Sequence, residues 1–271
     1  MTNLLGTSYK LDKSNAVGAA LSEPILNAVM YLAPSDSGGL GNLCPWATAG
    51  CRVVCLGIGS GRMNHGAAAL ASREFDWEKT TVSKAMIWRT KMFMKRRPAF
   101  KAKLDAEVGA LRAKARRQGM KTAVRLNGTT DIVWEKVYPE LFAKYHDVIF
   151  YDYTKAPRSV RASAPANYHL TFSYAETAAN HLNALDWLKA GKNIAVVFDT
   201  TKGEALPESF LSYKLSRAIP VIDADSDDMR FLDPVGVVAG LRAKGAAKHD
   251  KSGFVVAVEN INGAMVGIAQ P

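Results

Sequence analysis

A chain of 271 residues with 48% hydrophobic and 22% charged residues can bury one large core, which indicates a soluble globular protein. No segment approaches the roughly 20 consecutive apolar residues of a membrane-spanning helix, and the first residues lack signal-peptide features, so we expect a cytoplasmic protein without a membrane partner. The net charge of +10 is concentrated in residues 84–121, where thirteen basic and two acidic residues give +11 and leave −1 for the rest.

The first predicted strand, 27–32 (NAVMYL), is followed by a loop that holds all three cysteines, Cys44, Cys51 and Cys55, in the pattern C-x6-C-x3-C. An odd number of cysteines in one short loop is a poor disulfide framework, and in a reducing compartment it favours metal binding or redox chemistry. Three thiolates suit a [4Fe-4S] cluster, because they bind three irons and leave the fourth with an open, reactive coordination position.

Zinc is the alternative metal for the same loop. Structural zinc takes four ligands, and His65, which follows Cys55 in GRMNHG, would complete a set of three cysteines and one histidine. The spacings of six and three residues differ from the short knuckles that are typical of zinc sites. A loop without any metal is the third alternative.

The basic segment is predicted to form two helices, from Ser83 to about Arg97 and from Pro98 to about Gln118, because apolar residues recur in it at helical spacing. We expect a basic helical insertion at about 83–121 within a single domain, 1–271. Such a surface favours nucleic acid, bound through residues 84–121 by attraction to phosphates. An ordinary solvated helix face that happens to be basic is the alternative.

Further along the chain, short β-branched or aromatic runs alternate with helical patterns. The predicted strands are 122–126, 148–151, 168–172, 194–198, 219–222 and 254–258, and the predicted helices are 131–145, 178–190, 207–216 and 234–244. Strands that alternate with helices indicate parallel βα units. We therefore expect an α/β fold, a closed or partial (β/α) barrel, with a doubly wound open sheet as the second choice.

Both architectures gather reactive groups at the carboxyl ends of the strands, and the residues that follow the predicted strands are polar. We expect Arg125, Lys155 and Arg230 to hold a small anionic substrate or ligand, because buried cations need anionic partners. Tyr153, Asp223 and Asp225 are the candidates for proton transfer. The remaining candidates for binding the substrate are Asn127, Asp131 and Ser173.

A three-cysteine loop after the first strand of a parallel (β/α) barrel resembles the radical S-adenosylmethionine superfamily. The resemblance implies that Cys44, Cys51 and Cys55 bind a [4Fe-4S] cluster whose fourth iron chelates the methionyl amine and carboxylate of S-adenosylmethionine. The usual spacing there is C-x3-C-x2-C, and this chain has Asn127–Asp131 (NGTTD) where the superfamily has Gly-Gly-Glu after the second strand. A carboxylate or phosphate metabolite is therefore a second candidate ligand.

The cysteine loop, together with RLNGTTDIVWE and YDYTK, also resembles an uncharacterised protein family of tailed bacteriophages. This likeness covers most of the chain and supplies no activity. It implies expression in the cytoplasm of an infected bacterium.

The sequence thus predicts an iron–sulfur barrel protein, either a radical S-adenosylmethionine-like enzyme or a redox enzyme, that acts on a small anionic substrate. The alternative is a non-catalytic module, stabilised by an iron–sulfur cluster or zinc, that binds nucleic acid through its basic helices. An electron carrier is a third hypothesis.

Overall fold

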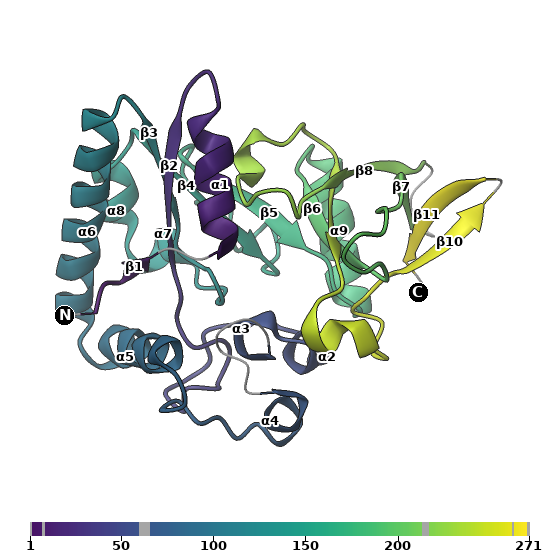
Figure 1. Ribbon diagram of the computed structural model, residues 1–271, viewed down its shortest axis with the longest axis horizontal. Coiled ribbons are helices and arrows are strands. Elements are labelled where there is room, and N and C mark those ends of the chain that lie inside the picture. The colour runs from purple at the N-terminus through teal and green to yellow at the C-terminus, as the bar shows by residue number, and fades with distance from the viewer. Residues whose placement is uncertain (1, 7–8, 60–65, 213–216, 262, 270–271) are drawn as a thin grey trace.

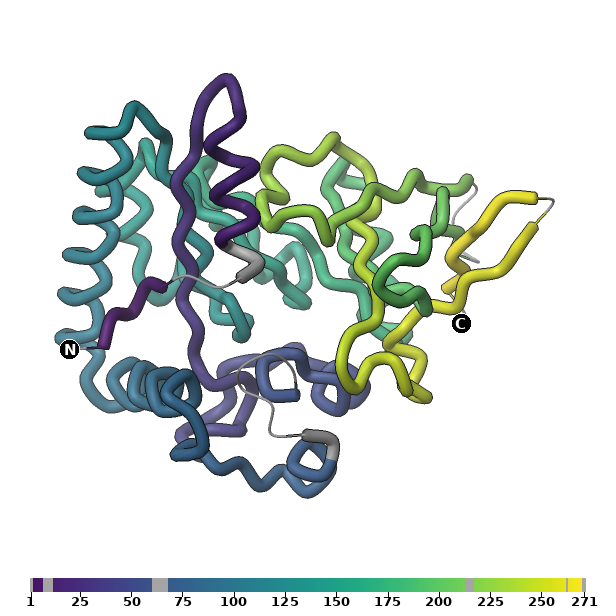
Figure 2. Tube along the Cα trace, in the orientation of Figure 1, coloured from purple at the N-terminus to yellow at the C-terminus, as the bar shows by residue number. Residues whose placement is uncertain are grey.

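The computed structural model describes residues 2–6, 9–59, 66–212, 217–261 and 263–269 (Figures 1 and 2). Within these ranges the chain forms one mixed sheet of 11 strands in the order β1-β2-β3-β4-β5-β6-β9-β8-β7-β11-β10. The strands are β1 (Leu5–Gly6), β2 (Ile25–Met30), β3 (Lys121–Arg125), β4 (Val148–Thr154), β5 (Tyr168–Ser173), β6 (Ile194–Phe198), β7 (Ser209–Ser212), β8 (Ile219–Asp223), β9 (Val238–Arg242), β10 (Ala257–Ile261) and β11 (Ala264–Ala269).

Helices of very different lengths surround this sheet. The α-helices are α1 (Tyr9–Ala19), α2 (Ala49–Val53), α3 (Leu56–Gly59), α4 (Gly66–Ser72), α5 (Thr81–Lys95), α6 (Arg97–Arg117), α7 (Trp134–Val137), α8 (Pro139–Lys144) and α9 (Ala178–Lys189). Two 3₁₀ helices cover Arg230–Leu232 and Gly245–His249. No helix among the described residues has both the length and the apolar character needed to cross a membrane.

The predicted (β/α) barrel, closed or partial, is wrong, because the sheet is open and mixed. Strands β2 to β6 are parallel neighbours in chain order, as barrel strands would be. After β6 the order turns back through β9 and β8 to β7, which is antiparallel to β8. The sheet then ends in an antiparallel β10–β11 pair that extends away from the parallel part, so no strand returns to pair with β1 (Figure 1).

The predicted strands correspond to β2, β3, β4, β5, β6, β8 and, shifted by three residues, β10. Two predicted helices are wrong, because 207–216 contains β7 and 234–244 contains β9. β9 lies between β6 and β8 and pairs with both, so Val238 and Ala239 lie in the buried centre of the sheet. Gly236 has φ +76°, which a helix does not allow, and a Cβ on Gly240 would lie 2.6 Å from Val221 Cγ1. Pairing with β8, rather than the helical pattern of residues 234–244, therefore determines that this segment forms a strand.

The two faces of the sheet are covered differently. Helices α5 to α8 pack on one face, where Phe100, Leu104 and Trp134 join Phe150 in the largest core cluster. Helix α9 covers β5 and β6 through residues such as Trp187. The opposite face carries α1 and the segment that contains Arg230–Leu232 (Figure 1). The two predicted basic helices are therefore confirmed as α5 and α6, which connect β2 to β3 and pack against the sheet through their apolar residues.

Candidate functional site

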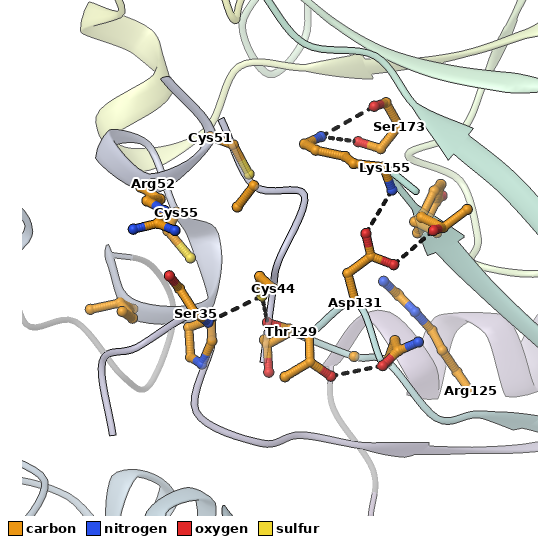
Figure 3. Close-up of a pocket in the computed structure, with 18 of the residues that line it drawn as sticks. Ser35, Cys44, Cys51, Arg52, Cys55, Arg125, Thr129, Asp131, Lys155 and Ser173 are labelled. Atoms are coloured by element: carbon orange, nitrogen blue, oxygen red, sulfur yellow. Dashed lines mark hydrogen bonds between the residues drawn. The ribbon is translucent and has the colours of Figure 1, made fainter. Parts of the chain in front are cut away.

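The cysteine loop lies beyond the carboxyl ends of β2 to β5, where α2, α3 and α4 form a separate layer at the bottom of Figure 1. Cys44 lies in the extended part of the loop, Cys51 lies in α2, and Cys55 directly precedes α3. All three border one pocket of about 160 Å³, and their side chains surround the same space in Figure 3. The other predicted site residues that line this pocket are Arg125, Asn127, Asp131, Tyr153, Lys155 and Ser173.

Helix α2, which carries Cys51, is held by a carboxylate from the end of β5. Thr48 is the N-cap residue and accepts a hydrogen bond from the Cys51 N–H at 3.2 Å. Glu176 accepts hydrogen bonds from Thr48 Oγ1 and from the Gly50 N–H, both at 2.8 Å. A Cβ on Gly50 would lie 2.3 Å from Ser252 Oγ, so only glycine allows this close approach. The position of Cys51 therefore depends on residues more than 100 positions away in the chain.

The loop after β3 forms the floor of the pocket, and Asn127 organises it. The buried side-chain amide of Asn127 donates to the Ile132 carbonyl at 2.9 Å, and its oxygen accepts from Thr130 Oγ1, the Ile132 N–H and Trp134 Nε1. The Asn127 N–H donates to Asp152 Oδ1 at 2.7 Å. The amide of Asn127 is thus occupied by its own loop, which indicates a positioning role rather than contact with a substrate.

Asp131 ties this loop to the end of β4. Its Oδ1 accepts a hydrogen bond from Thr154 Oγ1 at 2.7 Å, and its Oδ2 accepts from the Lys155 N–H at 2.8 Å. Burial raises the pKa of Asp131, although these hydrogen bonds and the nearby Arg161 favour its ionised form. Asp131 therefore keeps the strand end and the floor of the pocket together.

Lys155 places an ammonium group in the wall of the pocket. The residue is 8% exposed, and its Nζ donates to Ser173 Oγ at 2.5 Å and to the carbonyls of Ser173 and Tyr174 at 3.3 and 3.4 Å. Among the described residues, no carboxylate lies within ion-pair distance of this Nζ. The Nζ also lies 5.1 Å from the centre of the Phe254 ring. A buried cation held by neutral oxygens and an aromatic ring favours a bound anion.

Arg125, by contrast, already has a protein partner. Its Nη1 lies 2.5 Å from Asp228 Oδ2, and its guanidinium lies 4.8 Å from the centre of the Tyr153 ring. Burial disfavours its charge, but Asp228 outweighs that effect and raises the pKa of Arg125. Tyr153 Oη is buried and makes no hydrogen bond within the described part of the chain, and burial raises the pKa of this phenol. Arg125 therefore lines the pocket as part of an ion pair. The hydroxyl of Tyr153, by contrast, can still form a hydrogen bond with a ligand.

Two arginines that sequence reasoning did not identify also line the pocket. Arg52 lies 3.5 Å from Asp36, and Arg73 contacts the same carboxylate, so one negative charge faces two positive charges. Arg73 has φ +61° and Ser35 has φ +52°; both line the pocket and are the described non-glycine residues with a left-handed backbone. Strained conformations of this kind cluster at functional sites. Neither strain nor the shared Asp36 could be recognised in the sequence.

Burial favours the protonated form of two of the three thiols, Cys44 and Cys55. Burial raises the pKa of Cys44 to about 12 and that of Cys55 to about 11, and the neighbouring thiols add to both shifts. The Ser35 N–H donates to Cys44 Sγ at 3.1 Å, and none of the three cysteines is in a disulfide. A bound metal cation would reverse this preference, because it stabilises thiolates.

Three cysteine thiols are the right kind and number of ligands for an iron–sulfur cluster. Their side chains, however, are too far apart in this structure to bind one metal centre together. Among the described residues, no three Cys, His, Asp or Glu side chains are grouped closely enough to hold a metal ion. His65, the proposed fourth zinc ligand, lies outside the described residues. Cluster binding would therefore require the thiols to move toward one another.

Three predicted site residues lie elsewhere. Asp223 and Asp225 form ion pairs with Arg242 at 2.9 and 3.3 Å, and Asp225 also contacts Lys244. Arg230 is paired with Asp227 at 3.0 Å and with Asp233 at 3.1 Å. The open sheet explains the separation of Asp223 and Asp225, because β6 and β9 lie between β8 and the strands that build the pocket. Arg230 is separated for another reason, because its 3₁₀ helix packs on the opposite face of the sheet. A closed barrel would have brought these residues to the same mouth.

Comparisons with curated proteins and with solved structures gave no match. A family model described as Gene product 88 matches residues 3–258, which is nearly the whole chain. This match confirms the resemblance to a phage protein family and carries no information on metals or activity. The chain therefore belongs to the Gene product 88 family.

Proposed function

We propose that this pocket is the site of an iron–sulfur enzyme that acts on a small anionic substrate. The proposal rests on one observation: the three cysteines of the chain open onto one pocket whose opposite wall carries the buried ammonium of Lys155. Membership of a phage family agrees with expression in a reducing bacterial cytoplasm, where such thiols stay available for metal binding.

Cys44, Cys51 and Cys55 would hold the cluster through their thiolates. When bound by three thiolates, a [4Fe-4S] cluster supplies one-electron chemistry and one iron with an open coordination position. Helix α2, which carries Cys51, is held by the carboxylate of Glu176. The segment from Val54 to Ile58 around Cys55 is anchored by the buried side chains of these two end residues.

The cations of the pocket would bind the substrate. Lys155 provides a charge that pairs with no carboxylate in the described part of the chain, and Arg52 and Arg73 provide two charges that share the carboxylate of Asp36. A carboxylate or phosphate group matches these donors, and the carboxylate of S-adenosylmethionine is one example. Tyr153 Oη would hold a proton at the substrate, because its raised pKa keeps the phenol protonated.

The test is to purify the protein without oxygen and to measure iron, acid-labile sulfide and zinc together with absorption and electron paramagnetic resonance spectra. We expect about four irons and about four sulfides per chain, which replacement of any of the three cysteines by serine should reduce. Lys155→Gln is the matched control, because it should keep the cluster and lose only the response to anions. About one tightly bound zinc per chain without sulfide would contradict the proposal.

The substrate class is tested on the cluster-loaded protein. S-adenosylmethionine is added, followed by dithionite, and the spectrum of the reduced cluster and the yield of 5′-deoxyadenosine are measured. A changed spectrum with product formation would identify radical chemistry, and an unchanged spectrum would direct the search to other carboxylates and phosphates. If no anion changes the spectrum and loss of the metal unfolds the protein, the alternative of a metal-stabilised, non-catalytic module would be favoured.

A further inference from the structure

One face of α5 carries three lysines and a tryptophan in a single row. Lys84, Trp88, Lys91 and Lys95 are spaced by four, three and four residues, which places them within one narrow stripe of a helix. All four are exposed, and the stripe is about 16 Å long at 1.5 Å per residue. We call these four residues the α5 stripe.

The lysines of the α5 stripe are largely free of acidic partners. No ion pair to Lys91 or Lys95 is formed among the described residues, and Lys84 only shares an exposed contact with Glu78 at 3.3 Å. The basic residues of α6 differ, because several are neutralised by acidic neighbours. These pairs are Lys101–Glu140, Lys103–Glu107, Arg112–Asp147 and Arg116–Asp147. Lys91 and Lys95 are therefore two positive charges of the basic segment that no neighbouring carboxylate neutralises among the described residues.

Trp88 is the exception among the large apolar residues of its helix. It is 38% exposed, whereas Met86, Ile87 and Phe93 of the same helix are at most 5% exposed. The buried side of α5 is anchored to the segment that leads to the cysteine loop, where Thr90 Oγ1 accepts a hydrogen bond from the Ala33 N–H. Trp88 thus keeps more of its surface exposed than these three residues of the same helix.

We propose that the α5 stripe binds single-stranded nucleic acid. The lysines would contact successive phosphates, and the indole of Trp88 would stack on an unpaired base between them. A duplex keeps the faces of its bases stacked on one another, so it would leave the Trp88 ring without a stacking partner. This site is distinct from the cysteine pocket and does not depend on the proposed function.

The experiment measures binding of a fluorescein-labelled oligothymidine of about 15 nucleotides to the full chain by fluorescence anisotropy over a range of salt concentrations. Trp88→Ala should weaken binding by about fivefold to about a hundredfold, and Trp88→Phe should restore most of the affinity. Lys91→Gln combined with Lys95→Gln should lower the slope of log affinity against log salt by about 1.4, because each lost contact with a single strand contributes about 0.7.

Lys101→Gln combined with Arg116→Gln is the matched control, because it removes the same two charges from paired positions on α6. This control should leave the salt slope unchanged. All substitutions lie on helix surfaces, and circular dichroism is the check that each variant is folded. The proposal fails if no binding occurs at low salt, if the α6 control lowers the slope as much as the α5 variant, or if Trp88→Ala binds as tightly as the parent chain.

Discussion

The ammonium of Lys155 lies 2.5 Å from Ser173 Oγ and also donates to the Ser173 and Tyr174 carbonyls, so neutral oxygens hold this buried cation. This geometry links the end of β4 to the end of β5 on the wall that faces the three cysteines. It also makes the charge and the hydrogen bonds of Lys155 separable by experiment.

Lys155→Gln should abolish stabilisation by anions and leave the fold nearly intact, because glutamine keeps a donor but has no charge. Lys155→Met should lose both the charge and the donor and destabilise the protein by about 1–3 kcal/mol, since the Tyr174 carbonyl and Ser173 Oγ then lose their contact with Nζ. The Ser173 carbonyl, by contrast, keeps the hydrogen bond from Asn180. The measurement is the melting temperature with and without inorganic phosphate. An equal response to phosphate in the parent chain and in both variants would place the anion site elsewhere.

Asp36→Asn should tighten the binding of anions to the pocket. The carboxylate of Asp36 contacts both Arg52 and Arg73, and it competes with an external anion for these two cations. Phosphate titration by calorimetry is the readout, with an expected gain of several-fold. Glu74→Gln is the control, because it removes one negative charge next to Arg73 without altering this contact; the same gain in Glu74→Gln would reveal only a general charge effect.

The buried carboxyl of Asp152 should make folding stability depend on pH near neutrality. Burial raises its pKa to about 7, although a hydrogen bond from Tyr168 favours the ionised form. Between about pH 4 and about pH 7 the folded state holds a proton that the unfolded chain releases. Stability from this residue is therefore greatest at the acidic end and falls with rising pH, by up to about 4 kcal/mol.

Asp152→Asn resembles the protonated acid and should flatten the dependence, which urea denaturation at about pH 5 and about pH 8 would measure. Asp147→Asn is the control, because burial is outweighed there by Arg112 and the pKa of Asp147 is lowered, so its titration falls outside this window. A steep pH dependence that persists in Asp152→Asn would assign the effect to another group.

Gly128→Ala should disturb the floor of the pocket. A Cβ at this position would lie 2.6 Å from the Met30 carbonyl oxygen and 2.6 Å from the Tyr31 ring, so the loop after β3 must shift. We expect a loss of about 1–3 kcal/mol in stability and a lower iron content after cluster loading. Gly6→Ala is the control, because its Cβ would meet only the end of the Arg89 side chain at 4.0 Å. Unchanged stability in Gly128→Ala would show that the loop can adjust freely.

The sequence by itself determined the local features of this protein. The β-branched runs predicted the parallel strands β2 to β6, because fully buried strands require continuous apolar residues. Helical spacing predicted α5 and α6, and the clustering of Cys44, Cys51 and Cys55 within twelve residues favoured their opening onto the same pocket. Polar residues after consecutive parallel strands, such as Lys155 and Ser173, met in the pocket for the same reason.

Tertiary structure decided what depends on pairing between distant segments. The segment 234–244 became strand β9 because β6 and β8 pair with it on both sides, which outweighs its helical pattern. That same strand order moved Asp223 and Asp225 away from the pocket and left them to pair with Arg242. Arg52 and Arg73 entered the site because the chain places both beside Asp36. Local sequence patterns carry no record of such long-range partners, since each side chain takes its role from the neighbours that folding brings to it.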